Sequence, residues 1–214
     1  MQPPDISQSA ASFIPSTHSL KVLAIAAQEC RGCELYRHAT QVVFGSGKRT
    51  SRFFLVGEQP GDQEDLQGEP FVGPAGQLLN RVLDEAGIAK SDVYLTNSVK
   101  HFKFELRGKK RLHQKPSSRE VRACRPWLEK ELQILHPEVL ICLGATAAKS
   151  LLGSKIRIIA QHGQHLNSEW CANTMVTFHP SAVLRAPDAA ARRKMGEALL
   201  ADLKQAAQWL QSPS

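Results

Sequence analysis

Four short apolar runs alternate with helical patterns along this chain, and that alternation constrains the fold more than any other feature. The runs cover residues 52–56, 93–95, 139–143 and 175–178. Continuous apolar strands separated by helices are typical of a parallel sheet that is covered on both faces. We therefore predict an α/β fold, a three-layer α/β/α sandwich around a central, mainly parallel four-stranded sheet.

Helical patterns fill the intervals between these runs. Ser117 and Glu120 form a capping-box pattern that predicts the start of a helix running towards residue 135. Pro126 lies inside that span and is expected either to kink the helix or to mark its true first turn. The other predicted helices lie between residues 74 and 87, over 145–152, and over about 188–210.

A length of 214 residues suits one domain of ordinary size. We expect residues 1–20 to form a flexible N-terminal tail and residues 21–214 to form a single domain. The tail is rich in Gln, Ser and Pro and lacks the charged start and apolar block of a signal peptide. No apolar run approaches the length that spans a bilayer, so no membrane association is expected.

The positive charge of the chain is concentrated in one window. The net charge is +7, and residues 100–125 contain ten lysines and arginines but only two glutamates, so the rest of the chain is close to neutral. A cation cluster on a neutral body is the pattern expected for a polyanion partner. The alternative is a solvated helix face, but that requires interspersed acidic residues, which are scarce here. The window therefore favours a nucleic acid or another polyphosphate.

In parallel sheets of this kind, the ligand site lies beyond the carboxyl ends of the strands. Glu58 follows the first strand, and a carboxylate there can orient a histidine or accept a proton. Asn97 follows the second strand and suits the edge of a base, although capping a loop is the commoner use of Asn. Phe71 suits stacking on a base, or it plugs the core. His179 follows the fourth strand, where a single histidine is more often structural than catalytic.

The five cysteines include a Cys-x-x-Cys pair, Cys30 and Cys33. An odd count without secretory context makes a disulfide framework unexpected. The pair alone is compatible with a redox dithiol, half of a zinc site or half of an iron–sulfur site.

Taken together, the motifs at the strand ends resemble the uracil-DNA glycosylase superfamily, and specifically its iron–sulfur-containing family-four branch. The motifs that carry the resemblance are Gly57–Gly61 (GEQPG), Gly68–Gly76 (GEPFVGPAG), Thr96-Asn97, Leu143–Ala145 and His179–Ser181. Two departures from family four resemble the UdgX subgroup instead. His101 stands where family four has a cysteine, and an extra basic loop, residues 103–115, contains Lys109-Lys110-Arg111-Leu112-His113.

The UdgX resemblance implies an enzyme of DNA base repair that attacks uracil-DNA with a loop histidine and stays attached to it. His113 would attack C1′ of a flipped deoxyuridine, because a positioned neutral imidazole is a better nucleophile than water. Neighbouring cations would keep the ring neutral before attack, and Glu58 would stabilise its positive charge afterwards. Two alternatives stay open: a turnover glycosylase that uses water, and a non-catalytic iron–sulfur module that binds nucleic acid.

The resemblance implies further site residues by motif match. His179 and the backbone around Gln59 would hydrogen-bond uracil O2, Asn97 would read O4 and N3, and Phe71 would stack on the ring. Gly57 and Asp62 would line the uracil site. The residues expected to hold DNA phosphates are Lys109, Lys110, Arg111 and Arg185.

The resemblance also implies a 4Fe-4S cluster with a structural task. Its ligands would be Cys30, Cys33, Cys124 and His101, with Cys142 as the competitor of His101 for the fourth position and zinc as the alternative metal. Cys142 lies in an apolar run, where a core cysteine is expected. The expected partner is uracil-containing DNA, preferably single-stranded, and the protein is expected to be monomeric and to lie in the bacterial cytosol or nucleoid.

Overall fold

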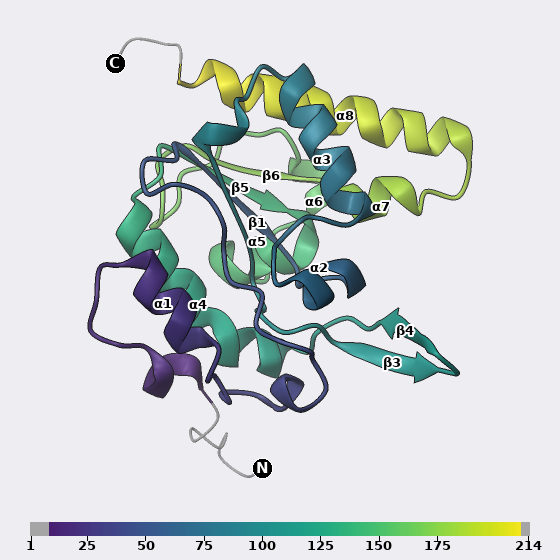
Figure 1. The fold of residues 1–214 in the computed structure, drawn as a ribbon. Coiled ribbons are helices and arrows are strands. Elements are labelled where there is room, and N and C mark those ends of the chain that lie inside the picture. Colours follow the sequence, from purple (N-terminus) through teal and green to yellow (C-terminus); the bar gives the residue numbers. More distant parts are fainter. Residues whose placement is uncertain (1–8, 211–214) are drawn as a thin grey trace.

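The computed structural model describes residues 9–210 and shows a four-stranded sheet between two layers of helices (Figure 1). The strands are all parallel, in the order β2-β1-β5-β6. Their bounds are Phe53–Gly57 for β1, Val93–Asn97 for β2, Val139–Leu143 for β5 and Thr174–Thr177 for β6. The predicted α/β/α sandwich with a four-stranded sheet is therefore confirmed.

The sheet is buried on both faces, which explains why its strands read as unbroken apolar runs. Phe53 and Leu55 of β1 pack on one face, in a core cluster with residues of α3 and α8. Phe54 and Val56 point to the other face and pack with α4 and α5. The helices are α1 (Leu20–Ala27), α2 (Asp62–Gln67), α3 (Pro74–Glu85), α4 (Ser118–Leu135), α5 (Gly144–Leu152), α6 (Ile158–Gln161), α7 (Pro180–Leu184) and α8 (Ala189–Gln208).

The start of α4 follows the predicted capping box. The Ser117 hydroxyl accepts from the Glu120 amide at 3.3 Å, and the Glu120 carboxylate accepts from the Ser117 amide at 2.6 Å. Pro126 lies inside the helix, so the expectation that it marks the first turn is wrong.

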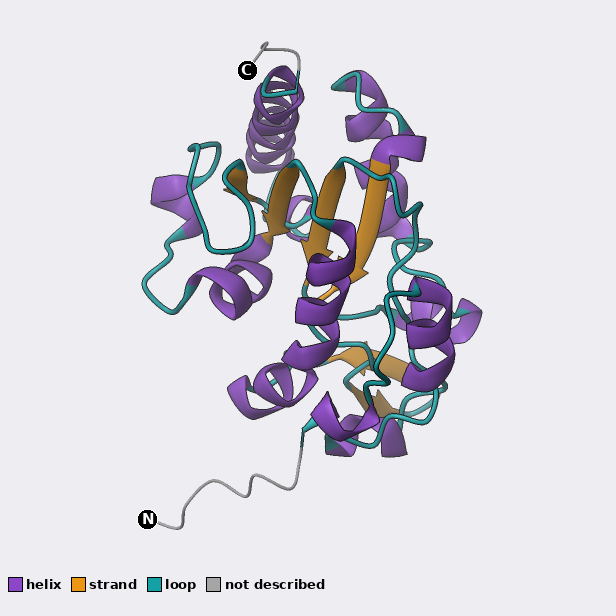
Figure 2. Cartoon of the chain, turned by 90° about the vertical axis from the view of Figure 1, so that its left-hand side faces the viewer, coloured by secondary structure: helices purple, strands orange, loops and turns teal. Residues whose placement is uncertain are grey.

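A short β-hairpin stands apart from the sheet and was not predicted. Its strands are β3 (Phe104–Arg107) and β4 (Lys110–His113), and the pair projects from the body of the molecule (Figure 1). Figure 2 shows the two strands below those of the sheet and separate from them. Gly108 is the first residue of the two-residue turn and has φ +60°, the left-handed conformation that such hairpin turns require and glycine tolerates. The hairpin brings the basic window back towards the sheet at His113.

Part of the predicted tail of residues 1–20 lies in the described range and packs against the domain. Residues 1–8 lie outside the described part of the chain, but η1 (Ala10–Phe13) is a 3₁₀-helix in contact with α4. Ala10 is 1% exposed, because it packs in a cluster with α1 and Trp127. The 3₁₀-helices η2 (Glu34–Arg37) and η3 (Lys90–Asp92) complete the element order. In the described range, no helix has the length and apolar character needed to cross a bilayer.

Candidate active site

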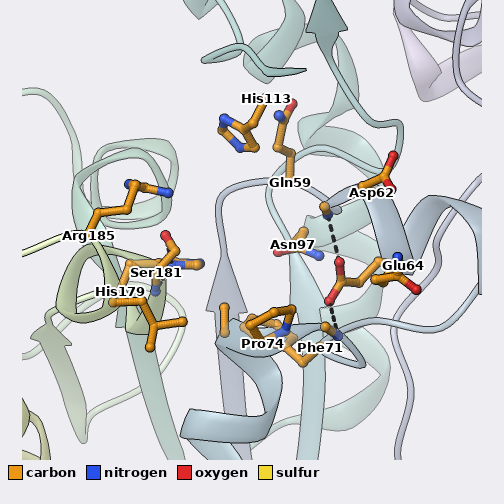
Figure 3. Close-up of a pocket in the computed structure, with 15 residues that line it drawn as sticks. Gln59, Asp62, Glu64, Phe71, Pro74, Asn97, His113, His179, Ser181 and Arg185 are labelled. Carbon is orange, nitrogen blue, oxygen red and sulfur yellow. Dashed lines mark hydrogen bonds between the residues drawn. The ribbon is translucent and has the colours of Figure 1, made fainter. Parts of the chain in front are cut away.

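The carboxyl ends of the parallel strands meet at one edge of the sheet and surround a cavity of about 280 Å³ (Figure 3). The register pairs Gly57 with Asn97 and Leu143 with Thr177, so the residues that follow each strand come together. The cavity is lined by seven of the twelve residues predicted for catalysis, uracil binding or DNA binding, namely Gln59, Asp62, Phe71, Asn97, His113, His179 and Arg185.

Gly57 lies where three of these side chains converge. A methyl group at this position would lie 2.3 Å from Asn97 Oδ1, 2.8 Å from Phe71 Cζ and 3.4 Å from His179 Nε2. Phe71 has φ +58° and is 6% exposed, and its ring lies 6.2 Å from that of His179 at an angle of 29°. Phe71 thus both packs in the core and presents a ring to the cavity. The absence of a side chain at Gly57 is what allows this convergence.

His179 is held in one protonation state by its neighbours. Its Nδ1 accepts from the Ser181 amide at 3.1 Å, so in the neutral ring the proton is on Nε2. Burial is the largest cause that lowers the pKa of His179 to about 4, and the charge of Arg185 and the nearby His113 contribute to the same shift. The ring is therefore neutral near pH 7 and offers an N–H donor from the Nε2 side.

His113 ends strand β4 at the mouth of the cavity, and its Nε2 lies 3.6 Å from Oε1 of Glu58. The other oxygen of Glu58 accepts a hydrogen bond from the Thr146 hydroxyl. Burial lowers the pKa of His113 below its ordinary value, Glu58 opposes that shift, and Arg185 adds to it. The predicted neutral imidazole beside a carboxylate is thus present, but the cation that lowers the pKa is Arg185 and not the lysines of the hairpin.

The side chain of Gln59 is occupied by the base of the hairpin. Its amide nitrogen donates to the carbonyl oxygens of Lys103, at 3.2 Å, and Gln114, at 3.0 Å, and its oxygen accepts from the Lys103 amide at 3.1 Å. Only the backbone of Gln59 is left to face a ligand. Gln59 therefore attaches the hairpin to the loop after β1.

Arg111 does not have the free guanidinium expected of a phosphate-binding residue. Its Nε donates to Asp62 Oδ1 and its Nη1 to Asp65 Oδ2, both at 2.6 Å, and its side chain is 17% exposed. The guanidinium also lies over the rings of Phe102 and Phe104, 5.5 and 5.1 Å from their centroids. Arg111 and Asp62 therefore join the hairpin to α2. Lys109 and Lys110, by contrast, are exposed.

Lys100 was counted in the basic window but cannot reach a partner in solution. It is 1% exposed, and its ammonium donates to Glu131 at 2.5 Å, to Thr96 Oγ1 at 2.5 Å and to the carbonyl oxygen of Asn97 at 3.0 Å. Tyr94 also donates to Glu131, at 2.9 Å. This buried network links α4 to the end of β2, where Asn97 lies.

Glu64 is a structural part of the site that the sequence interpretation missed. Its carboxylate accepts from the Gly61 amide at 3.1 Å and from the Gly73 amide at 2.7 Å, and so joins two loops that line the cavity (Figure 3). The available signal is its place at the third position of a helix that begins after Gly61, where a glutamate caps the first turn.

Three of the predicted cluster ligands share one buried region. Cys30, Cys33 and Cys124 belong to the core cluster around Trp127, whose indole N–H lies 3.3 Å from Cys30 Sγ. The Lys100 amide donates to Cys124 Sγ at 3.2 Å. Burial raises the pKa of Cys33 to about 11 and raises that of Cys124 further. His101 is also buried, which lowers its pKa to about 4, so its imidazole is neutral.

As these side chains lie, residues 9–210 contain no group of three or more His, Cys, Asp or Glu that converges on an ion-binding geometry. The donor set nevertheless fits an iron–sulfur cluster in type, since such a cluster is held by cysteine sulfurs and is tuned by hydrogen bonds to them. Cys142 packs instead in the cluster between the sheet, α4 and α5, together with Cys171. This separation from the other three cysteines argues against Cys142 as the fourth ligand.

Comparison with known proteins identifies the family to which this fold and this strand-end site belong. Residues 44–204 match the family model described as the uracil DNA glycosylase superfamily, and the chain belongs to that superfamily.

Individual similar proteins indicate a branch within this superfamily. A type-4 uracil-DNA glycosylase of Thermotoga maritima is 36% identical over 169 residues, which cover 78% of this chain and 83% of the relative. Type-4 uracil-DNA glycosylases of Archaeoglobus fulgidus and Pyrobaculum aerophilum are 33% and 34% identical over 171 residues each. These matches cover 74% and 75% of this chain, and 79% and 82% of the relatives.

Proposed function

We propose that this protein removes uracil from DNA in base repair and that His113 becomes covalently attached to the sugar. Superfamily membership and the type-4 relatives support the first part. The observation that carries the second is the pairing of His113 with Glu58 at the mouth of the strand-end cavity.

Uracil fits the cavity with its face towards Phe71 and its polar edge towards Asn97 and His179. The Asn97 amide both donates and accepts, as O4 and N3–H of uracil require. The Nε2–H of His179 and the backbone around Gln59 donate to O2, where negative charge develops as the base departs. Flipping the nucleotide out of the strand is what allows the base to enter.

His113 then acts as the nucleophile. The lone pair of one ring nitrogen forms a bond to C1′ while the bond between C1′ and N1 of uracil breaks, and its electrons leave with the base. The other ring nitrogen keeps its proton and faces Glu58, whose carboxylate stabilises the imidazolium. The departing uracil anion takes up a proton after release. An N-glycosyl imidazolium has no easily expelled group, so the adduct persists.

The test is a denaturing gel of the protein mixed with a single-stranded oligonucleotide that contains one deoxyuridine. A protein–DNA band that survives boiling in detergent is expected, with one uracil released per protein. His113→Ser should lose the band and gain repeated turnover, because a smaller side chain makes room for water. Turnover without a band in the unaltered protein would favour the water-using glycosylase. Salt-sensitive binding that does not distinguish uracil from thymine would favour the non-catalytic module.

We also propose that Cys30, Cys33, Cys124 and His101 hold a 4Fe-4S cluster, which ties the N-terminal segment to the base of the hairpin. The shared burial of the three cysteines supports this. Iron and sulfide analysis of protein purified without oxygen should give four of each, and His101→Ala should lower both, whereas Cys142→Ala should not. Zinc without sulfide would contradict the proposal.

The remaining expectations are part of the same proposal. The partner is uracil-containing DNA, with single strands preferred because no pairing must be broken before the base flips. The protein acts as a monomer in the bacterial cytosol or nucleoid.

A further inference from the structure

A second cavity, of about 800 Å³, adjoins the first and is also lined by His113. The residues common to the two cavities are Gln59, His113, His179, Ser181 and Arg185. A DNA strand that places one nucleotide in the first cavity can continue past this shared wall. The second cavity is therefore in reach of the next nucleotide.

The far wall of the second cavity is apolar and open to water. Ile156 and Ile158 are partly buried against the core, whereas Ile159 of α6 is 87% exposed. Phe178 and Met195 also line this cavity. Ile159 is not among the residues of the hydrophobic core clusters, so its exposure has no packing explanation among the described residues. Open apolar surface beside a binding site is typical of a contact with a ligand.

The rim of the second cavity is cationic. Lys115, Lys149, Arg157 and Arg185 line it, and all four are exposed. Nη1 of Arg157 donates to the Ser154 carbonyl at 3.2 Å, which holds the loop before α6. The one carboxylate among the lining residues, Glu58, is already bonded by Thr146 and faces His113. An apolar wall with a cationic rim complements a base attached to a phosphodiester.

We propose that the second cavity binds the nucleotide adjacent to the flipped deoxyuridine on the same strand. Its base lies against Ile156, Ile158 and Ile159, and its phosphate lies among the four cations. This inference rests on the proposed function, because it requires a deoxyuridine in the first cavity. Aliphatic side chains carry no hydrogen-bond pattern, so the site accepts any base.

The experiment uses single-stranded oligonucleotides in which a 2′-fluoro substituent makes the deoxyuridine resistant to cleavage. One oligonucleotide has neighbours on both sides, and the other two lack the 5′ or the 3′ neighbour. In the unaltered protein, loss of one of the two neighbours should weaken binding about tenfold, as loss of a base contact does elsewhere. Loss of the other neighbour should have a smaller effect.

Ile159→Glu should bind the full oligonucleotide about tenfold more weakly and should no longer respond to loss of that neighbour. Ile25→Glu is the matched control, because Ile25 is 64% exposed on α1, outside the cavity, and this variant should behave like the unaltered protein. Lys149→Gln should reduce the slope of log affinity against log salt by about 0.7, the value for one phosphate contact on a single strand.

The inference is overturned if removal of the neighbouring nucleotide weakens binding to Ile159→Glu as much as binding to the unaltered protein. It is also overturned if removal of neither neighbour weakens binding to the unaltered protein. The proposed function is tested separately on ordinary deoxyuridine. If the unaltered protein releases uracil from ordinary deoxyuridine but Ile159→Glu does not change binding of the resistant oligonucleotide, only the assignment of the second cavity is wrong. If the protein neither releases uracil nor binds the resistant oligonucleotide, both proposals fail together.

Discussion

At the scale of single residues, the proposed covalent capture depends on a neutral imidazole at His113. Burial and Arg185 lower its pKa, so the neutral form is present near pH 7 and is lost as the pH falls through that lowered value. We expect the single-turnover rate of adduct formation to be constant near neutral pH and to fall on acidification, with a midpoint below 6.5. A midpoint above the ordinary histidine value would contradict the assignment.

Glu58→Gln should change that profile in a defined direction. The carboxylate raises the pKa of His113, so its removal should move the midpoint to lower pH. The rate at neutral pH should fall about 10²-fold, because the imidazolium loses its partner. Glu138→Gln, an exposed carboxylate paired with Arg52, is the control and should leave both quantities unchanged.

Gly57→Ala tests the convergence of side chains in the strand-end cavity. The added methyl group would lie 2.3 Å from Asn97 Oδ1 and 2.8 Å from Phe71 Cζ, so one of them must move. Displacement of about 1 Å in such a site costs about 10²-fold in rate. Gly87→Ala meets no atom within 4 Å, and although its φ of +75° costs some stability, it should retain the rate. Equal rates of adduct formation for the two variants would show that the close packing around Gly57 does not matter for the reaction.

At the scale of elements, the hairpin contains two kinds of cation with different tasks. Arg111 is bonded to α2, so Arg111→Ala should loosen the hairpin and slow adduct formation about 10²-fold with little change in the salt dependence of DNA binding. The double variant Lys109→Ala/Lys110→Ala should leave the rate of adduct formation nearly unchanged. It should reduce the slope of log affinity against log salt by about 1.4, the value for two phosphate contacts on a single strand. Filter binding over a salt series, together with single-turnover rates, separates the two.

The buried pair of Lys100 and Glu131 should contribute to stability rather than to DNA binding. Lys100→Ala leaves the Glu131 carboxylate buried without its cation, which costs about 3–5 kcal/mol in the free energy of unfolding. Arg52→Ala removes an exposed pair and should cost much less. Urea denaturation measures both. A small loss for Lys100→Ala would mean that the pair is not closed in solution.

The elements that the sequence predicted well are those whose burial produces a pattern. The four strands and α3, α4, α5 and α8 each bury an apolar run or stripe, and all were predicted within a few residues. The hairpin was missed because its strands are four residues long and largely exposed, so the alternation of Phe104 and Leu106 with polar residues is too short to identify a strand. The roles of Arg111 and Lys100 were also missed, because each depends on partners more than 30 residues away.

At the scale of the whole molecule, the parallel sheet explains why distant motifs form one site. Each strand delivers its following residues to the same edge, so Glu58, Asn97 and His179 converge although they are far apart in sequence. The sequence predicted this convergence from strand direction alone. It did not predict how His113 arrives there, because the hairpin that brings it is attached by Gln59 and Arg111 and not by the sheet.

The most direct test of covalent capture is peptide mass mapping of the protein after reaction with a deoxyuridine oligonucleotide. The intact adduct should have the summed mass of protein and oligonucleotide less one uracil, and nuclease and protease digestion should locate the remaining sugar on the peptide that contains His113. A protein of unchanged mass, or a sugar attached to any other residue, would contradict the assignment of His113 as the nucleophile.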